Sequence, residues 1–440
     1  MGDASAGTSR VETTRAGRGL SHRSGSANDR MPTVWVLNHY AQEPGGPGGV
    51  RHFALARHLR ALGWNACIIA ASVELNTGRQ RLLPGEQRRL ESHDGVPFLW
   101  LKVPVYAGNG PGRMVNMLAY ALRALMRWNL RGLPRPQVVI GSSVHPFAAW
   151  AGARLARRHR VPFVFEVRDL WPQTLIDLGR LREGSLVARA LRLLERHLYR
   201  CADRILILMP GATEYIRTLG VSRDKIVWLP NGVDIGEFPY HPRSDRREEP
   251  FTLMYFGAHG TANGLENLIR AMAILKERRA SPAPLLRLIG DGPMKPSLRR
   301  LAVEMQLDNV RFEDPVPKAD IPAVAAQADA FVFNLVASPV FRYGISSNKL
   351  FDFMAAGRPV IFSCESVNNP VAEAHAGITV PPDRPERLAD AIETIAALSA
   401  AQRETMGLNA RRYVERNHDY RSLAARLAGV LNELSGRTKD

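Results

Sequence analysis

The sequence predicts an α/β protein in which two doubly wound domains follow one another and face each other across a cleft. Apolar, β-rich runs alternate with helical patterns along most of the chain, which is typical of βα units and parallel sheets. This alternation breaks once, at residues 236–250, where Pro, Arg, Asp and Glu gather, and then starts again. The length of 440 residues also exceeds one typical core and fits two domains of about 200 residues each. Ligands of such sheets bind beyond the carboxyl ends of the strands, so the cleft is the expected site.

These patterns divide the chain into five expected parts. Residues 1–30 are rich in Gly, Ser, Thr and Arg without an apolar segment, and are expected to be a disordered lead. Residues 31–235 are expected to form the first domain, 236–250 the linker and 251–415 the second domain. Residues 416–440 are expected to form a helix that packs back on the first domain.

Each element follows from a local pattern. Continuous apolar runs such as Val138–Ile140 suit strands that are covered on both faces of a sheet. The expected strands of the first half are Thr33–Asn38, Asn65–Ala71, Pro97–Val103, Gln137–Gly141, Pro162–Val167, Arg204–Met209 and Lys225–Leu229, with helices at Val50–Leu62 and Pro146–His159. Those of the second half are Phe251–Phe256, Leu285–Ile289, Asn309–Phe312, Ala330–Phe333 and Pro359–Phe362, and Pro385–Leu434 is expected to be helical.

The composition limits the classes of function. A net charge of +17 favours polyanions or an anionic membrane as partners. The basic residues are spread along the chain without a zinc-finger, RNA-recognition or zipper pattern, so nucleic acid is not an expected partner. No run reaches the roughly 18 apolar residues that a membrane span needs. Three widely spaced cysteines, Cys67, Cys201 and Cys364, fit buried free thiols in a reducing, cytoplasmic compartment.

A glycine-rich turn follows the first strand, in Glu43–Val50, and leads into a helix. Such a turn lets backbone N–H groups approach an anion, and the helix N-terminus adds positive potential. Gly48 and Gly49 are therefore candidate donors to a phosphate. A flexible surface turn is the alternative. The spacing is not G-x-G-x-x-G, which disfavours a nicotinamide enzyme.

A second candidate phosphate site lies in Tyr343–Val360. Ser346, Ser347 or Asn348 can cap a helix there, while Gly357 and Pro359 can end it. The N-terminus of this helix would present free N–H groups, hydroxyls, an amide and Lys349 to one point, which suits a diphosphate. Asp352, one turn further, can accept hydrogen bonds from a ribose diol. The alternative is that Lys349 and Asp352 are merely solvated.

Several motifs in order resemble the retaining glycosyltransferases of family 4, which have the GT-B fold. The likeness spans nearly all of residues 33–434. The motifs are Pro230–Asp234, Leu288–Pro293, Val310–Pro317, Ala328–Val332 and Asn348–Val360. The resemblance implies that Asp291 lies in a donor-binding turn and that Val316 lies near the nucleobase. It also implies a nucleotide-sugar donor, with uridine favoured, and a reaction without metal or cofactor.

A narrower resemblance, to the WbuB-type subgroup, is carried by Glu166–Pro172, Tyr255–Gly260 and Ser347–Asp352. It adds Gly257 and His259 to the expected donor site. The subgroup implies transfer of an N-acetylated amino sugar to a polyprenyl-diphosphate-linked or other glycan acceptor in surface-polysaccharide assembly. Cytoplasmic enzymes that act on such acceptors are expected at the inner face of the membrane.

The chain departs from the wider family at five positions. The family's second acidic residue, usually Glu, is Asp352 here. The family's first acidic residue is Gly344 here, and its Arg and Lys after the first strand of the second domain are Ala258 and Asn263. A family His near the acceptor is replaced by Arg168. Lys349, Arg342, Ser346 and the helix N-terminus are then expected to hold the donor.

The resemblance implies a mechanism that needs no protein nucleophile. The acceptor hydroxyl attacks from the face that the leaving diphosphate vacates, and a phosphate oxygen takes its proton, so the protein positions groups and stabilises charge. Lys349 and Arg342 are expected at the leaving group, and Arg168, Asp169 and His145 near the acceptor. His145 could instead cap the next helix, and Arg168 could pair structurally with Asp169.

Residues Arg113–Arg131 form the most suggestive amphipathic stretch. Met114, Met117, Leu118 and Trp128 follow helical spacing with arginines on another face, as in helices that lie on an anionic membrane. An ordinary helix packed on the first domain is the alternative.

Two other functions share the expected fold. A nucleotide-sugar 2-epimerase would use the donor site without an acceptor, and a non-catalytic interaction protein would explain the residues changed at 258, 263 and 344. Neither the sugar, the linkage nor the oligomeric state follows from the sequence.

Overall fold

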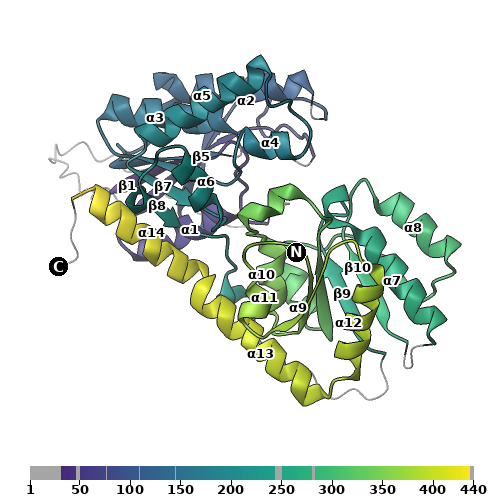
Figure 1. Cartoon of the computed structure of the whole chain (residues 1–440). Coiled ribbons are helices and arrows are strands. Elements are labelled where there is room, and N and C mark those ends of the chain that lie inside the picture. The colour runs from purple at the N-terminus through teal and green to yellow at the C-terminus, as the bar shows by residue number, and fades with distance from the viewer. Residues whose placement is uncertain are drawn as a thin grey trace, which may run out of the picture. The chain divides into compact units, whose positions relative to one another are not determined.

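The computed structural model describes residues 31–45, 50–75, 77–108, 110–143, 145–242, 250–279 and 283–436. The expected disordered lead at residues 1–30 lies outside this part of the chain, as do Gly48 and Gly49. Within residues 32–436 the chain forms two sheets with helices on both faces (Figure 1).

The first sheet has the strand order β3-β4-β2-β1-β5-β6-β7-β8. Seven of its strands are parallel, and β3 pairs antiparallel with β4 at the edge. The chain passes from β1 to β2 on one side and later returns to place β5 on the other side of β1. The strand order therefore reverses between β1 and β5, and ligands of such sheets bind at this switch point. The strands are β1 (Thr33–Leu37), β2 (Asn65–Ala71), β3 (Arg88–His93), β4 (Val96–Leu101), β5 (Val138–Ser143), β6 (Phe163–Val167), β7 (Arg204–Ile207) and β8 (Ile226–Trp228).

Alternate residues of this sheet enter two different cores. Trp35 and Leu37 pack with three helices on one face, whereas Val34 and Val36 pack with α1 (Arg51–Ala61) and α14 (Tyr420–Leu434) on the other. A strand with buried side chains on both faces must be apolar throughout, which explains the continuous apolar runs. The three helices on the first face are α2 (Pro111–Leu125), α3 (Pro146–His159) and α5 (Leu186–Cys201). Two short helices complete the first domain, α4 (Gln173–Asp177) and α6 (Ala212–Thr218), and α6 packs in the same core.

The second sheet is wholly parallel, with the order β11-β10-β9-β12-β13-β14. Its switch point lies between β9 and β12, where the loops after both strands meet. The strands are β9 (Thr252–Phe256), β10 (Leu285–Ile289), β11 (Val310–Glu313), β12 (Ala330–Asn334), β13 (Val360–Ser363) and β14 (Gly377–Val380). The helices are α7 (Leu265–Glu277), α8 (Lys295–Glu304), α9 (Ile321–Ala325), α10 (Asn348–Ala355), α11 (Pro370–Glu373), α12 (Pro385–Ala397) and α13 (Ala400–Asn417).

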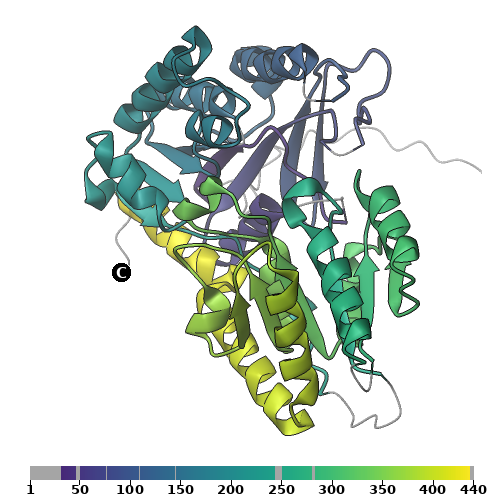
Figure 2. The same ribbon diagram turned by 45° about the vertical axis from the view of Figure 1, so that its right-hand side comes forward.

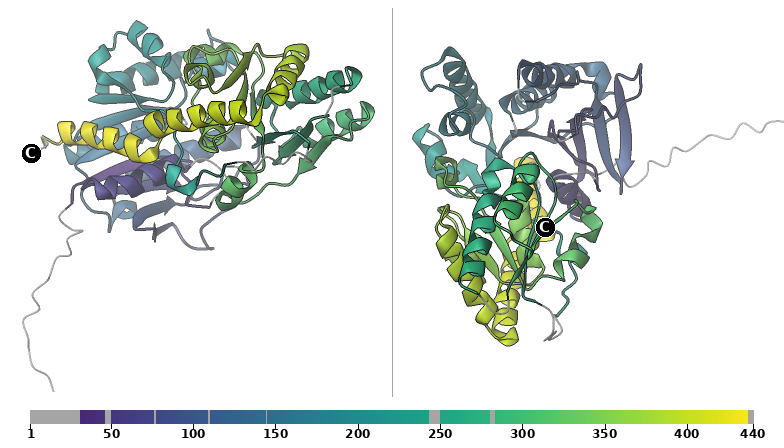
Figure 3. Two further views of the ribbon diagram at one scale, coloured as in Figure 1. Left: turned by 90° about the horizontal axis from the view of Figure 1, so that it is seen from below. Right: turned by 90° about the vertical axis from the view of Figure 1, so that its right-hand side faces the viewer.

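The last two helices contact different sheets. Helix α13 contacts α10, and α14 contacts α1, as the yellow helices in Figures 1 and 2 show. The chain crosses from one to the other at His418–Tyr420, which pairs with Val233: the Val233 N–H donates to His418 O at 2.9 Å, and the Tyr420 N–H donates to Val233 O at 3.1 Å. The view from below in Figure 3 (left) shows the same course of the yellow segment.

Three expectations about local structure need correction. Arg113–Arg131 is not one helix, because Met126 adopts an extended conformation (φ −75°, ψ 117°) that ends α2 before a 3₁₀ turn at Arg127–Leu130. The sequence analysis missed β3 and β14. Of the three cysteines, Cys67 and Cys364 are buried, but Cys201 is exposed at the end of α5. All three thiols are free.

Candidate functional site

The N-terminus of α10 has backbone and side-chain groups without protein partners. Ser347 occupies the N-cap position, but its side chain makes no capping hydrogen bond. The amide oxygen of Asn348 is buried and has no hydrogen-bond partner in the described part of the chain. Helix N-termini carry about half a positive charge and unpaired N–H groups. The N–H groups at this end of α10 therefore suit an anion, whereas the Asn348 oxygen suits a donor such as a ligand hydroxyl.

Ser346 joins the start of α10 to the end of the first domain. Its hydroxyl oxygen accepts from the Asn231 N–H at 2.8 Å, and its carbonyl accepts from the Asn231 side-chain amide at 2.6 Å. The Asn231 carbonyl oxygen in turn lies 3.0 Å from His418 Nδ1, whose ring stacks on Phe351 of α10 at 3.8 Å. These contacts fix the direction of α10, so Ser346 positions the site through Asn231.

Lys349, in the first turn of α10, reaches back over the carboxyl end of β9. Its ammonium group donates to the Tyr255 hydroxyl at 2.9 Å and to the Asn263 side-chain oxygen. It also lies 4.8 Å from the centre of the Tyr255 ring and 5.7 Å from that of Phe333. Burial lowers the pKa of Lys349 to about 7, because the charged form loses its water in this apolar setting. A bound anion would restore the charge.

Tyr255 and Asn263 are site residues that the sequence analysis did not nominate. The Tyr255 hydroxyl donates to Ala258 O at 2.8 Å, and the Asn263 amide donates to the same oxygen at 2.8 Å. The changed positions 258 and 263 therefore contact one another, and Asn263 also contacts the lysine. One signal in the sequence pointed to this part of the site: positions 258 and 263 both lack the cations that the family has there.

His259 is the most conspicuous unsatisfied group of the loop after β9. It is completely buried, and neither ring nitrogen has a hydrogen-bond partner among the described residues. Burial lowers its pKa to about 4, with a contribution from the charge of Lys295, so the ring is neutral near pH 7. Since buried polar atoms are almost always paired in proteins, a water or a ligand is expected against this ring.

Glycines allow the loops after β9 and β10 to lie close together. Gly257, with φ +141°, donates its N–H to Ile289 O at 3.0 Å. A Cβ at Gly290 would lie 2.0 Å from the Gly257 carbonyl oxygen, and one at Gly292 would lie 2.5 Å from His259 O. No other residue fits at these two positions. Asp291 between them is exposed and accepts from the His259 N–H through its carbonyl at 2.8 Å.

Asp352 and Val316 both belong to the second domain. Burial raises the pKa of Asp352 to about 6; Lys318 opposes the shift and Glu237 adds to it. Val316 follows β11 and packs, partly buried, against the core of the second sheet. Both remain predicted ligand contacts.

Arg342 does not stand free for a phosphate in this structure. Its guanidinium donates to both carboxylate oxygens of Asp177 at 3.1 Å and to the Tyr343 hydroxyl at 2.7 Å. Arg342 is half exposed, whereas the Asp177 side chain is buried. The pair links the loop before α10 to α4 of the first domain. A donor contact would require Arg342 to leave or share this carboxylate.

Arg168 and Asp169 follow β6 at the carboxyl edge of the first sheet. The Arg168 N–H donates to the Ser143 hydroxyl oxygen at 3.3 Å. Burial raises the pKa of Asp169, and the charge of Arg168 opposes the shift. Both side chains are partly accessible, which suits the predicted role near the acceptor as well as a structural pair.

His145 caps α3 and is completely buried. Its Nδ1 accepts from the Ala148 N–H at 3.4 Å, so the proton of the neutral ring is on Nε2, which lies 2.6 Å from His39 Nδ1. His39 must then carry its own proton on Nε2, and that atom has no partner among the described residues. Burial lowers the pKa of His39 to about 3 and that of His145 well below its usual value. His145 therefore orients His39 and could act on a substrate only through it.

A buried ionic network holds the first turn of α1, directly after the glycine-rich segment. Arg51 donates to Glu166 at 2.9 Å, to Leu229 O at 2.8 Å and to Pro230 O. The second oxygen of Glu166 accepts from His52 and from the Ser142 hydroxyl, both at 2.6 Å. Burial opposes the charge of Glu166, but His52 and Arg51 hold its pKa well below the usual range.

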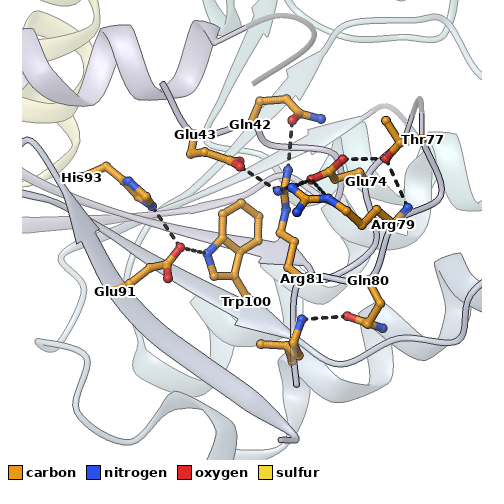
Figure 4. Close-up of polar contacts among 11 residues, drawn as sticks. Gln42, Glu43, Glu74, Thr77, Arg79, Gln80, Arg81, Glu91, His93 and Trp100 are labelled. Atoms are coloured by element: carbon orange, nitrogen blue, oxygen red, sulfur yellow. Dashed lines mark hydrogen bonds and ion pairs between the residues drawn. The ribbon is translucent and has the colours of Figure 1, made fainter. Parts of the chain in front are cut away.

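A second network fixes the segment that precedes the glycine-rich turn (Figure 4). Arg81 donates to Glu43 and Glu74, each at 2.7 Å, and to Gln42 at 3.0 Å. Its guanidinium lies 4.6 Å from the centre of the Trp100 ring. The end of β1 and the start of α1 are therefore both anchored by arginines. Gly48 and Gly49, between these anchors, lie outside the described residues.

The described residues include no group of three or more His, Cys, Asp or Glu side chains that could hold a metal ion. Nor does this part of the chain contain a helix both long enough and apolar enough to span a bilayer.

Two family models match the chain. One, described as "Glycosyl transferase 4-like domain", matches residues 48–232, and the other, described as "Glycosyl transferases group 1", matches residues 250–397. Together these ranges cover most of the sequence.

Curated proteins that are similar in sequence include the following two. The first is "Probable glycosyltransferase WbjE" of Pseudomonas aeruginosa, 27% identical over 249 residues, which are 54% of this chain and 60% of that protein. The second is "Alpha-D-kanosaminyltransferase" of Streptomyces kanamyceticus, 26% identical over 339 residues, 72% of this chain and 83% of that protein. The match thus spans less than two thirds of the length of the first relative.

Solved structures show the same fold. Sucrose-phosphate synthase from Thermosynechococcus elongatus superimposes with a TM-score of 0.70 at 19% identity, covering 93% of this chain and 100% of that one. HepE from Anabaena, in complex with UDP and glucose, gives a TM-score of 0.62 at 17% identity over 92% and 100% of the two chains. At these identities the likeness establishes the architecture alone.

Proposed function

The chain belongs to the glycosyltransferases of the GT-B fold, and on that premise we propose that it transfers a sugar from a nucleotide diphosphate sugar to a glycan or lipid-linked acceptor. One observation carries the proposal. The N-terminus of α10, the ammonium group of Lys349 and the unpaired ring of His259 gather after β9 and β12, at the switch point of the second sheet. A pyrophosphoryl ester satisfies all three, since it is anionic and rich in hydrogen-bond acceptors.

The leaving diphosphate is the group that this arrangement stabilises. As the sugar C1–O bond breaks, negative charge grows on the diphosphate, and a protonated Lys349 with the dipole of α10 lowers the energy of that charge. The acceptor hydroxyl forms the new bond to C1, and its proton passes to a phosphate oxygen. We propose that the reaction retains the anomeric configuration, as the resemblance to the retaining family implies.

Uridine is the favoured nucleobase in this proposal. HepE and a trehalose-6-phosphate enzyme of the same fold were solved with UDP or a UDP sugar, which supports a uridine donor without establishing it. The donor sugar is proposed to be an N-acetylated amino sugar. The relative named as a kanosaminyltransferase supports an amino sugar as the donor.

The acceptor is proposed to be polyprenyl-diphosphate-linked and therefore held at the inner face of the cytoplasmic membrane. Helix α2 supports this proposal, because Met114, Val115, Leu118 and Leu122 project from it into solvent, followed by Trp128 in the next turn. Exposed apolar side chains beside arginines are typical of surfaces that meet anionic lipid. The expectation that Met117 meets lipid is wrong, since that side chain is buried in the core.

Binding of nucleotides tests the donor half of the proposal. UDP should raise the melting temperature more than ADP or GDP at equal concentration, because a ligand that binds only the folded state stabilises it by about 2.7 kcal/mol at one hundred times its Kd. A chain with Lys349→Ala should lose most of this shift. Absence of any shift with every nucleoside diphosphate would sink the proposal.

Turnover tests the catalytic half. Lys349→Ala should lower the single-turnover rate by far more than about tenfold, a loss of more than about 1.4 kcal/mol of transition-state stabilisation, while circular dichroism remains that of the native protein. NMR of the product should show the anomeric configuration of the donor. An inverted product would refute retention but not transfer.

A further inference from the structure

A cavity of about 580 Å³ opens between α5 and α6, apart from the site described above. Its volume lies within the range of roughly 300–1,000 Å³ typical of ligand sites. The residues that line it are Leu193, Arg196, Tyr199, Arg200, Thr218, Leu219, Gly220, Val221, Ser222 and Lys225. None of these described residues is acidic, whereas three carry a positive charge.

The three cationic side chains of the cavity have hydrogen-bond donors that no described residue uses. Arg196 makes no side-chain hydrogen bond to any described residue, and Arg200 uses only Nε, on the Arg196 carbonyl at 3.3 Å. Lys225 gives one hydrogen bond, to Ala202 O at 3.1 Å. The C-termini of α5 and α6, the nearby Asp224, and Glu195 beside Arg196 oppose these charges. Each helix end carries only about half a charge and burial raises the pKa of Glu195 to about 7, so the three cations keep the cavity positive.

An apolar stripe leads into this cavity along α5. Leu186, Leu193 and Arg200 are spaced by seven residues and therefore share one face of the helix. Leu186 is 81% exposed and Leu193 65%, and Val187 beside them is also exposed. Large aliphatic side chains in contact with water, next to guanidinium groups that still have free donors, suit a ligand that has an acyl chain and an anionic head.

Helix α5 also belongs to the layer that carries the exposed face of α2. Both helices contact α3 and cover the same face of the first sheet, as Figure 1 shows. We infer that the cavity between α5 and α6 binds the phosphate of an anionic membrane phospholipid, with its acyl chain against Leu193 and Leu186. This inference rests on the proposed membrane contact of the layer, and extends it from a helix surface to a specific headgroup site.

Flotation of the full chain with vesicles tests the inference. The wild-type protein should bind phosphatidylcholine vesicles that contain phosphatidylglycerol, and bind pure phosphatidylcholine only weakly. The double variant Arg196→Gln/Arg200→Gln should lose about tenfold in affinity for the anionic vesicles, since each basic residue at such a surface contributes substantially. Leu193→Ser should weaken the binding that persists at high salt.

A matched control removes the same charge elsewhere. Arg412 and Arg416 are exposed, lie four residues apart on α13, and form no ion pair with the described residues, so Arg412→Gln/Arg416→Gln should bind vesicles like the wild type. Equal loss in both double variants would overturn the headgroup site in favour of general charge attraction. Unchanged binding in the Arg196/Arg200 variant would overturn it as well. So would inorganic phosphate that occupies the cavity, seen by NMR shifts of α5, without competition from anionic vesicles.

Activity separates this inference from the proposed function. If transfer to a water-soluble acceptor is intact in the Arg196/Arg200 variant and vesicle binding falls, both proposals stand. If no sugar is ever transferred but vesicle binding still depends on Arg196 and Arg200, only the proposed activity fails. If transfer occurs and the variant binds vesicles normally, only the headgroup site fails.

Discussion

The ammonium group of Lys349 lies 2.9 Å from the hydroxyl of Tyr255 and also contacts the side-chain oxygen of Asn263. The lysine belongs to α10 and both partners follow or end β9, so the contact joins the two loops that flank the switch point of the second sheet. Lys349 thus places a cation beside Asn263, the position at which this chain has an amide side chain instead of the family's cation. Its charge is nevertheless weakly held, since burial lowers its pKa to about 7.

Donor affinity should depend on pH through this lysine. The charged form binds a diphosphate better, and in the free protein that form is lost as pH rises through about 7. The Kd for UDP should therefore increase above pH 7, with uptake of protons on binding. Calorimetry in buffers of different ionisation enthalpy measures this uptake. Lys349→Arg, whose guanidinium stays charged, serves as the control and should show a flat Kd over the same range. A wild-type Kd that does not change from pH 6.5 to about 8.5 would contradict the role.

Asp352→Asn should stabilise the folded protein and weaken binding of the donor. The folded-state pKa of Asp352 is raised to about 6, so the native protein holds this proton more tightly than the unfolded chain does. The stability of the wild type therefore falls as pH rises from about 4 to 6, and Asn removes that loss. The gain above pH 6 has an upper bound of about 3 kcal/mol. Urea titrations at pH 4 and pH 7 measure it, and donor KM should rise if Asp352 binds the ribose. A variant less stable at pH 7 would refute the pKa assignment.

Arg342 and Asp177 should be coupled, and the coupling tells whether Arg342 serves the donor. If the arginine leaves Asp177 to bind diphosphate, Arg342→Gln raises donor KM and Asp177→Asn lowers it. If it only holds α4 to the loop before α10, the two variants should change KM alike. Because Arg342 is half exposed, the pair itself should contribute no more than about 1 kcal/mol to stability. A double-mutant cycle on unfolding free energy and on KM separates these cases.

Gly232→Ala should destabilise the crossing point of the chain. A Cβ at Gly232 would lie 2.3 Å from the His418 carbonyl oxygen, so the backbone of residues 418–420 must move, at a cost of roughly 1–3 kcal/mol. Gly429→Ala is the matched control: it is exposed within α14 with no atom near its Cβ, and should stabilise by about 0.5–1 kcal/mol. Urea unfolding of both variants gives the two values. Equal effects would show that residue 232 is not tightly packed against residue 418.

The fold was largely predictable from the sequence, since strands buried on both faces need apolar side chains throughout. The expected strands β2 and β10 agree with the structure at both ends, as does helix α3, and the GT-B architecture is confirmed. The edge strand β3 was missed because Arg88, Glu91 and His93 make it polar, as an edge exposed to water allows. The break at Met126 was missed because nothing in its local sequence interrupts the helical spacing of α2.

The candidate site was predicted in its residue types more than in its contacts. Sequence alone determined that a glycine-rich turn, and a short helix capped at Ser346, Ser347 or Asn348, would follow strands of two parallel sheets, because periodicity and glycine positions are local properties of the chain. Tertiary structure alone decided that Lys349 meets Asn263, that Arg342 pairs with Asp177 and that His145 turns inward to His39. Each of these contacts joins loops from different strands. The partner of such a side chain depends on which strands become neighbours and on how deeply the group is buried. The spacing of residues along one segment determines neither of these.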